Sequence, residues 1–257
     1  MKTFSIVARD DEKSQELSEY LTNKLVEGGL IEETDSPELV ISIGGDGTLL
    51  RAVHDYFDYI DKCKFISLHT GTLGFFSEYT YDDTNLLLDA ILNKAPTVYK
   101  RRLLEITKDD NEKLYAVNEA RIENIIHTQI IKVLINGENF ETFRGTGLCI
   151  STQAGSTAYN RSLGGAVVND DLELLQLTEI TGIHHNLYRS LQVPLILSPN
   201  TTITLQSIDY EQALLCYDAK FTTLHDAKKI ELKLSSKEIQ FLKYNQTTFV
   251  SKLRDLF

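Results

Sequence analysis

The stretch Leu39-Val-Ile-Ser-Ile-Gly-Gly-Asp-Gly-Thr48 indicates the fold class. A mostly apolar run leads directly into three glycines and an aspartate, and a helical pattern follows over residues 48–57. A continuous apolar run is typical of a strand buried in a parallel sheet. Glycines where such a strand meets a helix permit a sharp turn and let a ligand approach the backbone. The stretch therefore predicts a strand–loop–helix unit of an α/β fold, with a ligand at the carboxyl end of the strand.

The sequence on either side of this stretch repeats the alternation. Short apolar runs at residues 4–8 and 64–68 are typical of strands, and residues 11–27 and 82–93 have helical spacing. Strands that alternate with helices predict βαβ units and a parallel sheet. We therefore expect residues 1–96 to form an α/β domain that carries the glycine-rich loop.

The pattern changes near Pro96, after which strands predominate. Residues 97–235 are expected to form a β-rich domain, and Asn136-Gly137 predicts a hairpin turn. Two segments have helical character instead: residues 172–180, and the amphipathic residues 247–256. The segment 236–257 is expected to pack back on the first domain. The expected strands are residues 99–107, 114–123, 130–135, 138–143, 194–197, 202–206, 214–217 and 229–234.

Composition excludes several classes of partner. The formal net charge is -11, and no basic cluster offers a surface for nucleic acid. No apolar run approaches the roughly 18 residues of a membrane helix, and the first residues lack the hydrophobic region of a signal peptide. The three cysteines show no CxxC spacing, so a disulfide framework or a zinc site is not expected. These features predict a cytoplasmic protein without a nucleic acid or membrane partner.

The chemistry of the glycine-rich loop suggests phosphoryl transfer. Free N–H groups at the start of the following helix favour a phosphate. Asp46 would repel a phosphate if binding were the only task, so it suits a base or a metal ligand beside phosphates. The alternative is a plain strand-to-helix turn, although a turn does not require this order of small and acidic residues.

The loop resembles the GGDGT motif of NAD kinases, of diacylglycerol and sphingosine lipid kinases and, more loosely, of phosphofructokinases. The pattern GxxxxGK[ST] is absent, so this is not a Walker A loop. In the resembling enzymes the glycines frame the phosphoryl donor and the aspartate acts in phosphoryl transfer. The resemblance implies a donor site at Gly44, Gly45, Gly47 and Thr48, with Asp46 as general base and Mg²⁺ offsetting the phosphate charge.

Three further segments are similar to NAD kinases in particular and occur in the same order. In His69-Thr-Gly-Thr-Leu-Gly-Phe75, Phe75 would line the adenine end of an NAD site. Asn118-Glu119 would bind ribose hydroxyls, for which amide and carboxylate groups are suitable partners. Gly155-Ser-Thr-Ala-Tyr159 would contact NAD, although taken alone it could be a capped core helix.

The resemblance covers roughly residues 39–220 and is closest to NAD kinases of low-GC Gram-positive bacteria, through Phe143–Cys149 and Gln176–Glu179. It implies NAD as the acceptor, ATP or polyphosphate as the donor, and NADP as the product. It also implies a homodimer or homotetramer in which a neighbouring subunit completes the NAD site. The full set of implied NAD contacts is Gly47, Phe75, Asn118, Glu119, Arg144, Thr146, Thr157, Ala158, Tyr159, Ser162, Thr181 and Asp218.

Two positions depart from the family pattern. Thr146 stands where the family usually has an aspartate that contacts the nicotinamide end of NAD. Ala154 stands where the family usually has a hydroxyl side chain. Neither change touches the chemistry expected of Asp46.

Two other functions compete with this interpretation. A lipid kinase would share the GGDGT loop, but it must meet an anionic membrane, for which an acidic chain without a basic amphipathic segment is poorly suited. A nucleotide sensor would bind NAD without catalysis, but binding alone does not require the carboxylate of Asp46.

Overall fold

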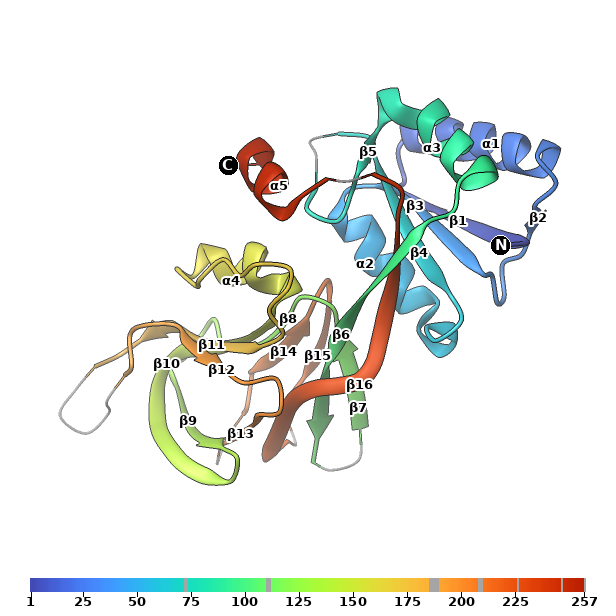
Figure 1. Ribbon diagram of the computed structural model, residues 1–257. Helices are drawn as coiled ribbons and strands as arrows, with labels where there is room; N and C mark the ends of the chain where they lie inside the picture. Colours follow the sequence, from blue (N-terminus) through green and yellow to red (C-terminus); the bar gives the residue numbers. More distant parts are fainter. Residues whose placement is uncertain are drawn as a thin grey trace. The chain divides into compact units, whose positions relative to one another are not determined.

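The chain forms two compact units, Met1–Arg101 with Lys237–Phe257, and Arg102–Ser236. The structure is a computed structural model that describes residues 1–71, 74–109, 112–184, 190–207, 210–225, 227–245 and 247–256 (Figure 1). Among these residues, no helix is both long enough and apolar enough to cross a membrane.

The first unit is built on a parallel sheet. Its central strand β3 (Leu39–Gly44) pairs with β1 (Thr3–Ala8) on one side and β4 (Lys64–His69) on the other, all parallel. The order is β2-β1-β3-β4 followed by the last part of β16, and β5 also pairs with β4. The other strands are β2 (Ile31–Glu32), β5 (Tyr79–Thr80) and β16 (Lys229–Lys243).

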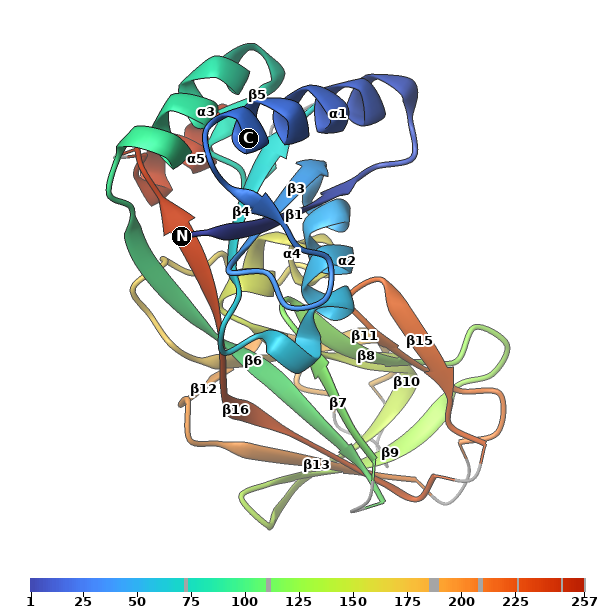
Figure 2. The same ribbon diagram turned by 90° about the vertical axis from the view of Figure 1, so that its right-hand side faces the viewer.

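Helices cover both faces of this sheet, which explains why β3 is apolar throughout. Helices α1 and α3 lie on one face and α2 on the other (Figures 1 and 2). Leu17, Leu21 and Leu25 of α1 recur every four residues and are buried against the sheet. The helices are α1 (Glu12–Glu27), α2 (Asp46–Asp55), α3 (Thr84–Asn93) and α5 (Phe249–Leu256), with 3-10 turns η1 (Phe57–Tyr59) and η2 (Tyr81–Asp83).

The second unit is antiparallel and encloses its own apolar core. Its strands follow the order β15-β14-β8-β10-β9-β13-β16; β11 pairs with β10 and β12, and β6 pairs with β7 and β16. Side chains from these strands form one buried cluster that includes Ile122, Phe143 and Leu205. The strands are β6 (Thr97–Lys108), β7 (Glu112–Ala116), β8 (Glu119–Glu123), β9 (Gln129–Ile135), β10 (Glu138–Thr152), β11 (Leu175–Gly182), β12 (Leu195–Leu197), β13 (Thr202–Gln206), β14 (Leu214–Tyr217) and β15 (Lys220–Thr223).

Strands β8 and β9 share one edge of β10. Gly147 pairs with β11 and β8, and Gly145 pairs with β11 and β9, so β11 occupies the opposite edge at both positions. Residues 124–128, between β8 and β9, therefore protrude from a nearly continuous edge and form the β8–β9 bulge. Asn124 fixes this bulge, because its Oδ1 accepts hydrogen bonds from the N–H groups of Ile126 and His127.

The structure corrects the helix expected at residues 172–180. This segment contains strand β11, which pairs along Leu175–Gly182 with β10 and through its first residues with β12. Its apolar spacing fits a helix, but pairing on both edges and burial of Leu175 and Leu177 favour the extended form. The strand expected at 114–123 is also divided, since Val117 and Asn118 separate β7 from β8.

Candidate active site

The glycine-rich loop joins β3 to α2 within the first unit. Gly44 has φ +149°, and a Cβ at this position would collide with the side chain of Thr48. Gly45 is the N-cap of α2 and has no side chain with which to cap that end of the helix. The helix begins at Asp46, two residues earlier than the sequence pattern predicts. Its first N–H groups therefore adjoin the glycines, where a phosphate would be stabilised.

Backbone N–H groups from a second segment hold the Asp46 carboxylate. Phe75 N donates to Oδ2 at 2.7 Å, and Phe76 N donates to Oδ1 at 3.3 Å. A Cβ on Gly74 would collide with this carboxylate, so glycine is needed at that place. A carboxylate offers about four lone-pair sites. Two hydrogen bonds therefore orient Asp46 and leave it able to accept a proton.

Helix α5 supports the segment that orients Asp46. Lys252 Nζ donates to Phe75 O at 3.1 Å, and the rings of Phe75 and Phe249 meet edge to face with centroids 5.7 Å apart. Lys252 is only 6% exposed. The end of the chain therefore stabilises the loop that carries the Phe75 and Phe76 donors.

His69 also lies beside the glycine-rich loop, although it is not among the predicted site residues. It ends β4, next to β3, and its Nε2 lies 3.5 Å from the place a Cβ of Gly45 would occupy. Its Nδ1 accepts from Gly71 N at 3.2 Å, and burial lowers the pKa of the imidazole. His69 could have been found from its position at the carboxyl end of a strand that pairs with β3. Thr72 and Leu73, which belong to the same motif, lie outside the described residues.

In the second unit, Asp218 positions the Asn118-Glu119 pair. Its Oδ2 accepts from Val117 N and its Oδ1 from Asn118 N, both at 2.8 Å. Asp218 N donates to Glu119 O at 3.1 Å. Asp218 therefore fixes the backbone where β7 ends and β8 begins.

Asn118 and Glu119 present buried oxygens that lack hydrogen-bond donors. Asn118 Oδ1 and Glu119 Oε2 are inaccessible to solvent and have no partner among the described residues. The two side chains belong to residues only 6% and 5% exposed. Burial, followed by the nearby charge of Asp218, raises the pKa of Glu119 to about 7. Unpaired buried acceptors are costly and therefore indicate a ligand that supplies donors.

The GSTAY segment lies against the same pair. It forms a 3-10 turn η3 (Ala154–Thr157) followed by a short helix α4 (Tyr159–Ser162), and Thr157 Oγ1 donates to Ala154 O at 3.4 Å. The backbone N–H of Tyr159 faces Glu119 and lowers the pKa of that carboxyl group. Neither Ser156 nor Thr157 caps a helix, because Ser156 Oγ instead accepts from Val168 N. Tyr159 and Ser162 are exposed, whereas Thr157 and Ala158 are half-buried.

Arg144, Thr146 and Thr181 lie elsewhere in the second unit. Glu119 pairs with Ser151, and Thr146 lies five residues earlier in β10, roughly 17 Å along an extended strand. Thr146 O accepts from Asn124 N and from Gln129 Nε2, so its backbone anchors the bulge. Thr181 is exposed with φ +50° at the end of β11. The chain therefore does not bring these three residues to Asn118 and Glu119.

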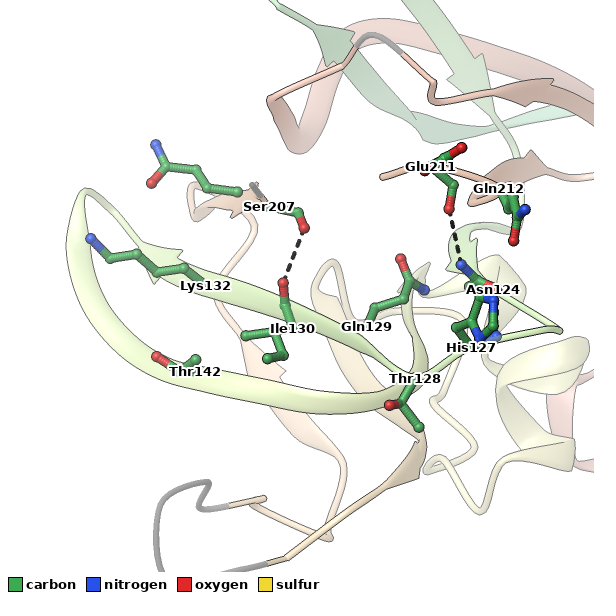
Figure 3. A pocket seen from close by; sticks show the side chains of 11 residues that line it. Asn124, His127, Thr128, Gln129, Ile130, Lys132, Thr142, Ser207, Glu211 and Gln212 are labelled. Carbon is green, nitrogen blue, oxygen red and sulfur yellow. Dashed lines mark hydrogen bonds between the residues drawn. The ribbon is translucent and has the colours of Figure 1, made fainter. Parts of the chain in front are cut away.

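A cavity of about 760 Å³ in the second unit contains none of the predicted residues (Figure 3). It lies beside the β8–β9 bulge, and most of the residues that line it have polar side chains. Asn124 Nδ2 donates to Glu211 O and Ser207 Oγ to Ile130 O across its wall. The lining residues are Asn124, His127, Thr128, Gln129, Ile130, Lys132, Thr142, Gln206, Ser207, Glu211 and Gln212. Among the described residues, no group of three or more His, Cys, Asp or Glu side chains could hold a metal ion.

Comparison with known proteins decides between the kinase families. The model of the ATP-NAD kinase N-terminal domain matches residues 5–95, and that of the ATP-NAD kinase C-terminal domain matches residues 110–244. The chain belongs to the NAD kinase family. Family membership makes it a kinase and confirms the resemblance seen in its motifs. The lipid kinase interpretation is therefore set aside.

Individual relatives agree with this assignment over almost the full chain. An NAD kinase of Lactobacillus acidophilus is 37% identical and covers 98% of this chain, which spans 96% of that protein. An NAD kinase of Staphylococcus carnosus is 35% identical, with coverage of 99% and 97%.

Solved structures of NAD kinases share the fold. Yeast NADH kinase complexed with NADH superimposes with a TM-score of 0.83 at 19% identity, covering 100% of this chain and 87% of the yeast chain. An NAD kinase from Archaeoglobus fulgidus in complex with ATP gives 0.77 at 20% identity, covering 99% and 100%. The expected architecture, an α/β parallel-sheet domain with a β-rich domain, is thereby confirmed.

Proposed function

We propose that the enzyme transfers a phosphoryl group to the 2′-hydroxyl of the adenosine ribose of NAD, which gives NADP, with Asp46 as general base. The names of its relatives support NAD as the acceptor, and neighbours of the same fold contain NADH and ATP. The observation that carries the proposal is the Asp46 carboxylate, which Phe75 N and Phe76 N orient at the start of α2.

The proposed step needs a base, an acceptor oxygen and a leaving group. Asp46 accepts the proton of the 2′-hydroxyl through an oxygen lone pair that the Phe75 and Phe76 donors leave free. The ribose oxygen forms a bond to the terminal phosphorus of the donor, and the bond from that phosphorus to its bridging oxygen breaks. The shortened donor leaves with the electron pair of that bond.

Asn118 and Glu119 are proposed to hold the ribose. Their buried oxygens need donors, which the vicinal hydroxyls of a ribose provide. Asp218 keeps the two residues in place through their backbone, while Phe75, Thr157, Ala158 and Tyr159 contribute contacts to the dinucleotide.

The donor is proposed to bind at Gly44, Gly45, Gly47 and Thr48, where the first N–H groups of α2 favour phosphate. ATP and polyphosphate both offer a terminal phosphoryl group and both remain candidates. Mg²⁺ in proteins is usually bound through one or two carboxylates together with substrate phosphates. The carboxylate of Asp46 at the start of α2 fits such an ion brought by the donor, where it would offset phosphate charge.

We further propose a homodimer or homotetramer located in the cytoplasm. Arg144, Thr146 and Thr181 lie far along β10 and β11 from Glu119, which fits residues that contact the NAD bound by a neighbouring subunit. The free thiols of Cys63, Cys149 and Cys216 fit a reducing compartment.

Product formation tests the proposal. The purified enzyme is incubated with NAD, Mg²⁺ and ATP or polyphosphate, and NADP is measured with an NADP-specific dehydrogenase; NADH in place of NAD gives the acceptor preference. We expect NADP with at least one donor. Absence of NADP with ATP, other nucleoside triphosphates and polyphosphate would contradict the proposal and favour a nucleotide sensor.

A further inference from the structure

Arg121 lies on the same face of β8 as Glu119. Side chains alternate along a strand, so Glu119, Arg121 and Glu123 project to one face. Ala120 and Ile122 project to the other face, into the apolar core. An arginine two residues beyond a ribose-binding glutamate is therefore placed near the proposed dinucleotide site.

The guanidinium of Arg121 lies beneath the ring of Tyr159. Its Cζ is 3.8 Å from the ring centroid, within the range of a cation–π contact. Arg121 Nη1 donates to Glu123 Oε1 at 2.6 Å, and the two side chains are only 18% and 16% exposed. The neighbours of Arg121 across the sheet are Cys149 and Cys216, which are small enough to leave space for the guanidinium.

Tyr159 therefore adjoins both residues. Its backbone N–H faces Glu119, and its ring rests on Arg121. The residue is still 36% exposed, although Arg121 covers one face of the ring. Arg121 Nε is buried without a hydrogen-bond partner among the described residues, so hydrogen bonding alone does not explain the arginine at this place.

We propose that Arg121 is a positioning residue for NAD: it fixes the Tyr159 ring so that the outer face of the ring stacks on a flat heteroaromatic ring of the dinucleotide. The inference rests on the proposed function, in which Tyr159 contacts NAD. Both adenine and nicotinamide are flat, and aromatic pairs of this kind favour offset stacking. The phosphoryl donor makes no use of this contact.

Steady-state kinetics of Arg121→Met test the proposal. Methionine retains much of the apolar stem and removes the cation. We expect the KM for NAD to rise about tenfold, as a partly desolvated cation–π contact allows. The kcat and the KM for ATP should stay within about twofold of wild type. Lys113→Met is the matched control, because it removes a cation that pairs with Glu105 at 3.1 Å and should leave both KM values unchanged.

A double-mutant cycle with Tyr159→Ala separates positioning from a general structural role. In that background Arg121→Met should change the KM for NAD by less than about twofold, since the ring it positions is gone. Arg121→Lys should fall between wild type and Arg121→Met, because an ammonium keeps the charge but not the planar stack. If Arg121→Met fails to fold, Arg121→Lys carries the same cycle.

Binding of the two halves of NAD identifies the stacked ring. Calorimetry with AMP and with nicotinamide mononucleotide should show that Arg121→Met weakens one of them about tenfold and leaves the other unchanged. An unaltered KM for NAD, equal weakening of both halves, or an undiminished effect in Tyr159→Ala would overturn the proposal. These results are distinguishable from failure of the proposed function, because in that case the wild-type enzyme itself would form no NADP.

Discussion

The proposed binding role of Glu119 is accompanied by a cost in stability. Burial raises its pKa to about 7, whereas a glutamate in the unfolded chain titrates near its ordinary value of 4.5. The folded state therefore binds this proton more tightly, and the contribution of Glu119 to stability falls as the pH rises from about 4.5 to about 7. A pKa shift of this size lowers the free energy of unfolding by roughly 3 kcal/mol at pH 8.

Glu119→Gln should remove the loss of stability that the buried carboxylate causes at high pH. We expect the free energy of unfolding to rise by up to about 3 kcal/mol at pH 8 and to change little at pH 4.5, as measured by urea denaturation. The same variant should bind NAD more weakly, because a neutral amide accepts fewer hydrogen bonds from ribose. Wild-type KM for NAD should rise as the pH falls below about 7, as Glu119 becomes protonated. Equal stability of the two proteins at pH 8 would contradict the assigned environment of Glu119.

At the residue scale, sequence predicts chemistry but not long-range contacts. Asp46 could be selected because an aspartate in a glycine-rich loop suits phosphoryl transfer, whereas Asn118-Glu119 could be selected only through the resemblance to NAD kinases. The bonds from Asp218 to the backbone of Val117 and Asn118 join residues about a hundred positions apart, which no local pattern reveals. The stacking of Arg121 on Tyr159 is hidden for the same reason.

At the scale of elements, the start of α2 depends on the loop that faces it. A Cβ on Gly74 would collide with the Asp46 carboxylate, whereas a Cβ on Gly71 would meet no atom within 4 Å in the part of the chain that the structure describes, chain neighbours aside. Gly74→Ala should therefore displace the carboxylate from the Phe75 and Phe76 donors. A misplacement of about 1 Å can reduce turnover about 100-fold.

Gly71→Ala is the matched control for this loop. We expect it to keep near wild-type kcat, while Gly74→Ala loses activity and retains the melting temperature to within a few degrees. Turnover with saturating substrates and thermal unfolding are measured for both. Similar kcat values for the two variants would show that the loop does not orient Asp46.

Elements with strong local patterns were predictable, and one with an ambiguous pattern was not. Helix α1 and strand β3 appear where the spacing of apolar residues places them. Residues 172–180 were expected to be helical, but β10 and β12 provide pairing edges that the segment alone cannot show. The early start of α2 at Asp46 follows from the capping position of Gly45, which the motif does not specify.

At the scale of the whole molecule, the exposed isoleucines of the β8–β9 bulge and of the start of β9 suit the proposed contact with a second copy. Ile125, Ile126 and Ile130 are 81%, 62% and 47% exposed, and contiguous apolar residues on a surface favour association. The net charge of -11 opposes self-association, so an apolar contact would be needed. We expect light scattering to give the mass of a dimer or tetramer at micromolar concentration.

A charge on the bulge should weaken this assembly. Ile126→Asp is expected to lower the average mass towards that of a monomer and to raise the KM for NAD, because subunits would no longer complete each other's sites. A wild-type protein that is monomeric and fully active at nanomolar concentration would be incompatible with the proposed oligomer.

Asp46 is proposed to be the general base, and the Asp46→Asn variant tests this role most directly. Asparagine has nearly the same shape and still offers one acceptor oxygen to the Phe75 and Phe76 donors, but it cannot take up the ribose proton. Turnover at saturating NAD and donor is measured beside NAD affinity by calorimetry. We predict a loss of about 10²- to 10⁴-fold in turnover, the usual effect of removing a general base, with NAD affinity largely intact. Retention of more than about a tenth of wild-type turnover, or a loss confined to NAD affinity, would show that Asp46 is not the base.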